Sequence, residues 1–454
     1  MTLENLIKKY DLPVPRYTSY PTVPFWDLEK FDNQKWIKAI TRAFNESNTE
    51  KGISLYIHLP YCESLCTYCG CNKRITKNHL VEEKYVETVL AEWDIYLRHF
   101  KQRPVIRELH LGGGTPTFFS PQSLNNLITR LLADCELHPQ HEFSFEGHPN
   151  NTTFEHMQVL FDLGFKRISL GIQDFDEKVQ KTINRIQPFD RVREATENAR
   201  KIGYESINFD LIYGLPHQTR ASIEKTMDFI KLLRPDRIAF YSYAHVPWKS
   251  PGQRGYSTDD LPGNVEKRAL YELGKAKLSE FGYYDIGMDH FSLPQDDLYK
   301  AAKNKALHRN FMGYTICNTD LLIGLGASSI SDAKYAYAQN AKKVETYQEI
   351  IATDVLATFK GHFLSDTDLS IKNFLLGILC KEEATWDQLV FKSLATKAFT
   401  DLKTMKNEGL LLTSSQGIKV TALGKAFIRN ICAVFDKKLQ DANTHSSELF
   451  SKAI

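Results

Sequence analysis

The chain has 454 residues with 57 Lys and Arg against 55 Asp and Glu, so its net charge at pH 7 is only +2. This balance excludes a general electrostatic attraction to nucleic acid or to an anionic membrane. With 42% hydrophobic residues, the chain is long enough to form two or three units, because single cores stop growing at about 250–300 residues. No stretch approaches the roughly 20 apolar residues of a membrane span, and the first residues lack the apolar core of a secretory signal. A cytoplasmic protein is therefore expected.

The first predicted element is an extended arm. Residues 1–50 contain the run Pro13-Val-Pro-Arg-Tyr-Thr-Ser-Tyr-Pro21, whose prolines remove backbone donors and exclude a helix. After the arm, the apolar run Ile53–His58 predicts a buried strand. Tyr56 and His58 alternate along this strand, so their side chains face the same side.

Three cysteines follow the strand at a spacing that indicates a metal site. Cys62, Cys66 and Cys69 form the pattern C-x3-C-x2-C, which supplies three of the four thiolates that a cubane iron–sulfur cluster usually takes. One iron would then stay open for another ligand. A zinc site completed by Cys71 is the alternative. The other cysteines are scattered singly, which is typical of a protein in the reducing cytosol: Cys135, Cys317, Cys380 and Cys432.

From residue 53 to 291, short apolar runs alternate with longer amphipathic ones. The short runs predict strands at Ile53–His58, Ile106–Leu111, Glu142–Glu146, Arg167–Ile172, Ser206–Ile212, Arg237–Tyr243 and Tyr284–Met288. The amphipathic runs predict helices at Val81–Phe100, Ser123–Leu132, Arg191–Ile202, Ala221–Leu233 and Val265–Phe281. Strands separated by helices favour parallel pairing with right-handed crossovers, and hence a partial or complete (β/α) barrel. A doubly wound open sheet would also accommodate the pattern.

Polar and glycine-rich residues fall at the carboxyl ends of these strands, where parallel βα folds place their functional groups. Gly112-Gly-Gly-Thr-Pro116 follows the second strand, Glu146 ends the third, Gln173 follows the fourth and Asp210 lies in the fifth. Successive glycines allow a ligand to approach the backbone closely. One face of one barrel would therefore collect these groups together with the cysteines and Arg185.

The last part of the chain differs in pattern. Residues 361–454 predict two helices, a hairpin near residues 407–421 and a final helix from Leu423, an order that resembles a winged helix. This segment carries 12 Lys and Arg against 10 Asp and Glu, and nucleic-acid binding needs a concentrated basic surface. A packing or lid role is the better interpretation.

Taken together, these segments resemble the bacterial oxygen-independent coproporphyrinogen III oxidases, a family of the radical S-adenosylmethionine (SAM) superfamily. The resemblance runs from the arm to the last helix. Its motifs are Tyr56-Ile-His-Leu-Pro-Tyr-Cys62, Cys66-Thr-Tyr-Cys-Gly-Cys-Asn72, Gly112–Pro116, Gly171-Ile-Gln-Asp-Phe175, Asp210-Leu-Ile-Tyr-Gly-Leu-Pro216, Tyr243-Ala-His245, Gly287-Met-Asp-His-Phe291, His308-Arg-Asn-Phe311 and Arg429-Asn-Ile-Cys432.

The resemblance implies an α/β fold built on the radical SAM partial TIM-like (β/α) barrel. An N-terminal arm, residues 1–50, would cover the active site, and residues 51–295 would form the catalytic barrel. Residues 296–360 would connect and complete the cofactor site. Residues 361–454 would form a mostly helical, winged-helix-like C-terminal domain.

The resemblance also assigns roles to single residues. In the family, the thiolates matching Cys62, Cys66 and Cys69 hold a [4Fe–4S] cluster, SAM chelates the fourth iron, and Cys71 is not a ligand. The first SAM is lined by positions matching Tyr56, Gly113, Glu146 and Ile330. A second SAM lies near positions matching Tyr68, Gly114, Thr115, Gln173, Arg185, Asp210 and Ala244. The expected catalytic side chains are Tyr56, His58 and Glu146. Two positions depart from the family pattern, Met312 in place of a glutamine and His148 in place of an acid.

The activity implied is the anaerobic oxidative decarboxylation of two propionates of coproporphyrinogen III to vinyl groups, giving protoporphyrinogen IX for haem synthesis. A 5′-deoxyadenosyl radical from reductive SAM cleavage would abstract a hydrogen from each propionate. The expected partners are an electron donor such as flavodoxin or ferredoxin and no nucleic acid, and the protein would act as a monomer. Arg16, Arg185 and Arg309 are candidates for holding the substrate carboxylates, because bidentate arginine suits such groups. A haem chaperone and another tetrapyrrole-acting radical SAM enzyme are the alternatives.

Overall fold

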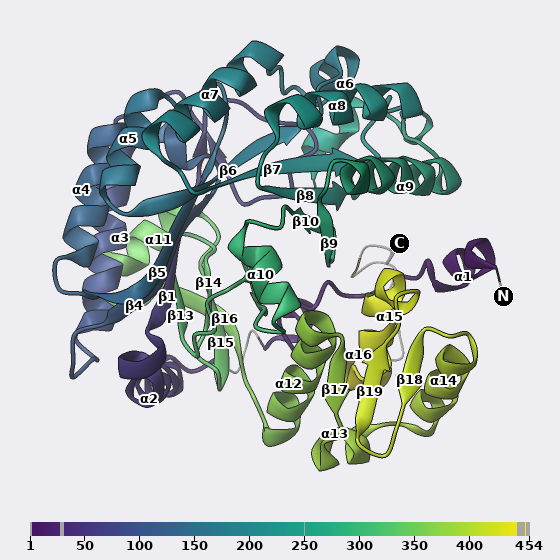
Figure 1. The fold of residues 1–454 in the computed structure, drawn as a ribbon. Coiled ribbons are helices and arrows are strands. Elements are labelled where there is room, and N and C mark those ends of the chain that lie inside the picture. Colours follow the sequence, from purple (N-terminus) through teal and green to yellow (C-terminus); the bar gives the residue numbers. More distant parts are fainter. Residues whose placement is uncertain (1, 28–30, 249, 443–449, 451–454) are drawn as a thin grey trace. The chain divides into compact units, whose positions relative to one another are not determined.

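A computed structural model of the chain describes residues 2–27, 31–248, 250–442 and 450 (Figure 1). The chain divides into two compact units. The barrel unit comprises residues 32–299 and 319–359, and the C-terminal unit comprises residues 1–31, 300–318 and 360–454. None of the described helices is both long and apolar enough to cross a membrane.

A single large sheet forms the core of the barrel unit. Its strand order is β16-β15-β14-β13-β1-β4-β5-β6-β7-β8-β10-β9, an open series in the part of the chain that the structure describes. The neighbouring strands from β13 to β8 run parallel. They are β13 (Leu322–Leu325), β1 (Ile53–Leu59), β4 (Val105–Gly113), β5 (Glu136–Gly147), β6 (Phe165–Gln173), β7 (Ser206–Tyr213) and β8 (Arg237–Ser242). This order agrees with the predicted parallel βα architecture, and no closure of the sheet is seen among the described strands.

Antiparallel strands flank the parallel series on both sides. On one side these are β10 (His290–Ser292) and β9 (Tyr284–Gly287); on the other they are β14 (Ile330–Asp332) and β15 (Ala336–Asn340). Beyond β15 the order ends with β16 (Thr358–Phe363). The strand predicted at Tyr284–Met288 therefore exists, but it does not continue the parallel series. The reason is local: Met288 and Asp289 both have positive φ, a conformation that turns the chain straight back as a hairpin.

Helices cover the outer face of the parallel strands (Figure 1). They are α2 (Asn33–Lys51), α3 (Val81–Leu97), α4 (Pro121–Leu132), α5 (Phe154–Asp162), α6 (Glu177–Thr182), α7 (Phe189–Ile202), α8 (Arg220–Leu233), α9 (Asn264–Glu280) and α11 (Val344–Ile351). Capping fixes where several begin, as at Thr153 and Thr219, whose side chains accept the N–H three residues on. Gly203 ends α7 in the left-handed conformation that favours glycine. Helices α3, α4, α5, α7 and α8 each return the chain to the amino end of the next parallel strand.

The C-terminal unit combines the two ends of the chain. Its elements are α1 (Leu3–Tyr10), the hairpin β11 (His308–Asn310) and β12 (Gly313–Thr315), α12 (Asp366–Lys381), β17 (Glu383–Thr385), α13 (Gln388–Ser393), α14 (Thr396–Asn407), β18 (Leu411–Thr413), β19 (Gly417–Val420), α15 (Ile428–Ala433) and α16 (Lys437–Asp441). The predicted hairpin is β18 and β19, and β17 adds a third strand beside β19 that the sequence pattern did not indicate.

The arm is fastened to the last helices of this unit. Buried Arg429 donates to the carbonyl oxygens of Val14 and Pro15, in the latter case over 3.1 Å. The Tyr17 hydroxyl donates to Asp436 over 3.2 Å. As predicted from its prolines, the run from residue 11 to 22 contains no helix. The arm keeps its place through side chains that lie more than 400 residues later in the sequence.

Candidate active site

A closed loop carries the three cysteines at the end of β1. The short strands β2 (Tyr61–Cys62) and β3 (Arg74–Ile75) pair in parallel and bring the two ends of the loop together. The Thr76 N–H donates to the Cys62 carbonyl over 2.9 Å, and the Arg74 N–H donates to the Pro60 carbonyl over 2.7 Å. Because both ends are hydrogen-bonded, the cysteines project from a loop of fixed length.

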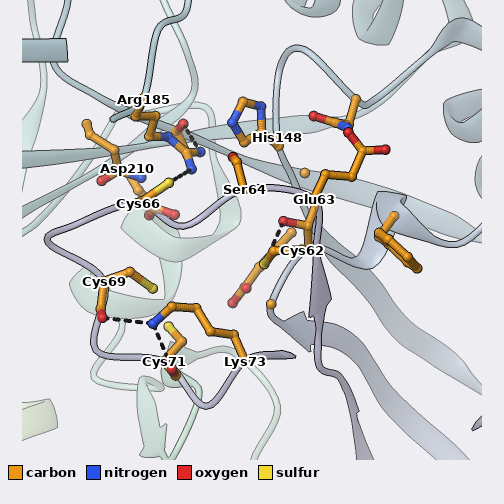
Figure 2. A pocket seen from close by; sticks show the side chains of 18 of the residues that line it. Cys62, Glu63, Ser64, Cys66, Cys69, Cys71, Lys73, His148, Arg185 and Asp210 are labelled. Carbon is orange, nitrogen blue, oxygen red and sulfur yellow. Dashed lines mark hydrogen bonds between the residues drawn. The ribbon is translucent and has the colours of Figure 1, made fainter. Parts of the chain in front are cut away.

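The three thiols are half-buried and free of disulfides. Figure 2 shows Cys66 beside Arg185, whose Nη1 donates to the Cys66 sulfur over 3.4 Å. The Cys62 sulfur lies 3.3 Å from the Thr115 hydroxyl. Burial raises the pKa of Cys62 to about 11, whereas a hydrogen bond with the Cys71 thiol lowers the pKa of Cys69. The thiols therefore lie in distinct electrostatic surroundings.

The loop forms one wall of a cavity of about 670 Å³. Another wall comes from the carboxyl ends of β4 to β8, which contribute Gly113, Glu146, Gln173, Asp210 and Tyr241. Segments between the strands add further lining residues, among them His148 and Arg185. The cavity is large enough for a ligand of cofactor size. The structure thus brings together the strand ends that the sequence pattern placed on one face.

Glu146 is held against the glycine run. Its Oε2 accepts the Gly113 N–H over 3.3 Å, and its Oε1 lies 3.4 Å from His110 Nε2. A Cβ on Gly112 would lie 3.0 Å from Glu146 Oε1 and from the Tyr56 ring. Gly113 has a φ of 121°, which L side chains rarely adopt. The absence of side chains here lets the backbone and the carboxylate share one small space.

A second polar group lies across the cavity on β6 and β7. Asp210 accepts hydrogen bonds from Ser169 over 3.1 Å and from Asn208 over 3.0 Å. Burial, followed by the nearby Glu146 charge, raises the pKa of Asp210 to about 6. Arg185 donates from Nη2 to the Gly171 carbonyl over 2.6 Å, while its Nε has no hydrogen-bond partner among the described residues.

Tyr56 and His58 tie β1 to the far end of the cysteine loop. His58 Nε2 lies 2.9 Å from the Asn72 carbonyl and so must donate to it, which leaves Nδ1 to accept from the Tyr56 hydroxyl at 3.0 Å. Burial lowers the pKa of His58, so the ring is neutral. Neither side chain lines the cavity, and the same is true of Ala244 and Ile330. Ile330 instead lies against Gly324, the residue that pairs with Tyr56 in the sheet.

Two polar residues near the site were missed by sequence reasoning. His110 contacts Glu146. It lies two residues before Gly112 on β4 and so faces the same side of the sheet, and this alternation could have identified it from the sequence. Gln253 is 1% exposed, and its Nε2 lies 3.2 Å from the carbonyls of both Tyr68 and Ala244. Gln253 therefore connects Tyr68 and Ala244, two positions that the family resemblance assigned to the second SAM. No local sequence signal marks it, because it lies in a 3-10 helix of only five residues, Pro251–Gly255, and Tyr68 is 185 residues away in the sequence.

The residues present suit an iron–sulfur cluster with SAM. Among the described residues, no three ligating side chains converge on a point that one ion would occupy. A cubane cluster does not require this, because each thiolate binds a different iron. Beside the thiols lie the acceptors Glu146 and Asp210 and the unpaired Nε of Arg185. These groups can meet the amino and carboxylate groups of an amino-acid ligand.

Comparison with known proteins identifies the family. Residues 56–230 match the radical SAM superfamily. The oxygen-independent coproporphyrinogen III oxidase of Pseudomonas aeruginosa is 37% identical over 99% of this chain and 98% of its own length. The chain belongs to this family. The enzyme of the same name from Escherichia coli is 36% identical over 96% of this chain and 95% of its own.

A solved structure agrees with the assignment to the oxygen-independent coproporphyrinogen III oxidases. The coproporphyrinogen III oxidase of Escherichia coli, described as a radical SAM enzyme, superposes with a TM-score of 0.88 at 34% identity. The match covers 96% of this chain and 99% of that one. It confirms the predicted radical SAM fold, and membership in the superfamily implies a [4Fe–4S] cluster and SAM as cofactors.

Proposed function

We propose that the chain catalyses the anaerobic oxidative decarboxylation of two propionates of coproporphyrinogen III, giving protoporphyrinogen IX for haem synthesis. The observation that carries this proposal is the cysteine loop at the mouth of the strand-end cavity, in a chain that matches the oxidases over almost its whole length. When bound, the cluster and SAM supply a 5′-deoxyadenosyl radical that removes a hydrogen atom from the substrate.

The chain's own residues bind and orient these groups. Cys62, Cys66 and Cys69 hold the cluster, and the fixed length of their loop sets its position. Of the four positions assigned to the first SAM, Gly113 and Glu146 would contact it from the cavity wall, and Tyr56 and Ile330, which do not line the cavity, would act through neighbouring residues. Glu146 accepts from its amino group, while Tyr56 acts through His58 on the loop. A second SAM molecule would be surrounded by seven residues: Tyr68, Gly114, Thr115, Gln173, Arg185, Asp210 and Ala244. Arg185 would face its carboxylate.

The substrate carboxylates require cations, and Arg309 is a strong candidate within the C-terminal unit. It is 6% exposed, and its Nε and Nη1 have no hydrogen-bond partner among the described residues. Its guanidinium lies 4.8 Å from the centre of the Tyr314 ring, and its Nη2 is 3.5 Å from the Arg16 carbonyl. A buried guanidinium without an acidic partner is costly. A propionate bound by Arg309, with Arg16 beside it, would remove that cost.

Within the arm predicted at residues 1–50, the segment before α2 covers the active site in this proposal, and residues 296–360 complete the cofactor site. Residues 361–454 form the supporting domain. The protein acts as a monomer, with a carrier such as flavodoxin or ferredoxin as electron donor.

The test is anaerobic incubation of the reconstituted protein with SAM, dithionite and coproporphyrinogen III, followed by chromatography of the porphyrins. We expect protoporphyrin after oxidation of the product, and none from the Cys69→Ser variant. Bound haem with no turnover would favour the chaperone alternative. A modified or opened macrocycle would favour another radical SAM enzyme acting on tetrapyrroles.

A further inference from the structure

A group of basic side chains lies around the end of the cysteine loop, although the chain as a whole is almost neutral. Lys73, Arg74 and Lys77 follow the last cysteine with no acidic residue from 70 to 81. Lys342 and Lys343 lie beside them, because Asn72 Nδ2 donates to the Lys342 carbonyl over 2.9 Å. We call these five residues the basic rim.

The basic rim is attached directly to the residues that carry the thiols. Ile75 pairs with Cys62 across β2 and β3. Lys73 Nζ donates to the Cys69 carbonyl over 3.0 Å, and Figure 2 shows this side chain alongside Cys69 and Cys71. A protein bound on the rim would therefore lie within a few side chains of the cluster ligands.

Most charge on the rim is not neutralised within the chain. Arg74 forms an ion pair with Glu345 over 2.9 Å, but both side chains are more than half exposed, and such pairs contribute little. Lys77, Lys342 and Lys343 are exposed, and none has an ion pair among the described residues. Two other acids lie nearby: Glu63 faces His79 and Asn151, and buried Glu82 faces His79. Ile75 adds an apolar side chain that is 40% exposed.

We propose that the basic rim is the docking surface for an acidic one-electron carrier protein that reduces the cluster. The proposal rests on the function proposed above, because radical formation from SAM consumes one electron. Electron transfer weakens steeply with distance, so the carrier must approach the cysteine loop closely. Complementary charge raises the rate of such encounters and fixes their orientation, and transient redox complexes need only a small contact area. A local basic surface with one exposed apolar residue meets these requirements.

Another use of the rim would be to hold the carboxylates of the tetrapyrrole. Lys73 and Lys77 line the cavity, whereas Lys342 and Lys343 do not. Substitution of Lys342 and Lys343 therefore changes the docking surface without changing the lining of the cavity. For this reason the test uses these two residues.

The test uses full-length reconstituted protein with the double change Lys342→Glu/Lys343→Glu. The control is Lys201→Glu/Lys231→Glu, in the last turns of α7 and α8, which lead to the amino ends of β7 and β8 and away from the loop. Both double variants change the net charge equally. Retained iron content and circular dichroism show that each is folded, and Lys342→Gln/Lys343→Gln serves as a milder second variant.

A flavodoxin is the acidic probe. Its binding to each variant is measured by flavin fluorescence, which requires no turnover, and cluster reduction by reduced flavodoxin or by dithionite is followed by stopped flow. We expect the rim variant to bind flavodoxin about tenfold more weakly and to be reduced about tenfold more slowly by it. Higher salt should abolish the difference. Dithionite reduction, and all values for the control, should not change.

Unchanged flavodoxin binding in the rim variant, or an equal loss in the control, would overturn the proposal. A raised KM for coproporphyrinogen in the dithionite assay of Lys77→Glu, with flavodoxin binding unchanged, would assign the rim to substrate carboxylates instead. Failure of the proposed function has a different signature: the wild-type protein would form no protoporphyrinogen even with dithionite, whatever the binding data.

Discussion

Replacing Glu92 by glutamine should remove a large pH dependence of stability from the barrel unit. Glu92 lies on α3 and is 0% exposed. Its carboxylate accepts from the Gly326 N–H over 2.8 Å, the Tyr347 hydroxyl over 2.6 Å and Asn340 Nδ2 over 2.6 Å. Burial outweighs these three donors and raises the pKa of Glu92 from 4.5 to about 7. The turn that it holds, between β13 and β14, leads to Ile330.

The sign and size of this pH dependence of the free energy of unfolding follow from proton linkage. Between pH 4.5 and about 7 the folded protein keeps a proton on Glu92 that the unfolded chain has lost. Its contribution to stability is therefore greatest below pH 4.5 and is lost as the pH rises to about 7. The full change is about 3 kcal/mol, at about 1.4 kcal/mol for each pH unit, and about 2 kcal/mol of it falls between about pH 5 and 7.5.

Urea unfolding of wild type and Glu92→Gln under anaerobic conditions, at several pH values, measures the difference in free energy of unfolding. We expect that difference, wild type minus variant, to fall by about 2 kcal/mol as the pH rises across this range. Asp174→Asn would be a poor control because burial also raises the pKa of Asp174 to about 7; Glu224→Gln, on the exposed face of α8, is suitable. A difference independent of pH would refute the reasoning, since Glu92 would then be ionised throughout.

Four further substitutions test the site. Cys69→Ser should abolish iron–sulfur absorbance and SAM cleavage, while Cys71→Ser should keep the cluster; loss of iron in both would indicate a four-thiolate site. Glu146→Ala should weaken SAM binding by about tenfold or more without loss of iron, as measured by equilibrium dialysis, and parallel loss of iron would contradict its assignment. Arg16→Gln should spare the cluster and SAM binding but reduce decarboxylation, so a wild-type rate of product formation would remove Arg16 from the substrate site.

The predicted parallel core was readable from the sequence because most of its strands are buried on both faces and the helices between them are amphipathic. Strands such as Ile53–Leu59 are almost continuous apolar runs, and their boundaries differ from prediction by a residue or two at most ends. The same logic predicts Glu146, Gln173 and Asp210 at one edge of the sheet, where the structure has them. Hydrophobic periodicity and the geometry of parallel sheets were sufficient to predict the parallel strands and the site residues at their ends.

Long-range pairing could not be read in the same way. β13 joins β1 from more than 250 residues away, and its four residues are too few to show a period. Gln253 lies in the 3-10 helix Pro251–Gly255, which is too short to show a repeating pattern. The attachment of the arm to Arg429 and Asp436 likewise depends on tertiary contacts, so the sequence showed only that the arm is extended.

The attachment of the arm sets an order of events during synthesis. Arg429 and the arm carbonyl it holds are separated by 414 residues, which a ribosome takes about 20–80 s to add at roughly 5–20 residues per second. The barrel unit is complete by residue 359, before the helices that anchor the arm have been made. The first segment to be translated is thus among the last to reach its place, and the cysteine loop is formed before the arm is fixed.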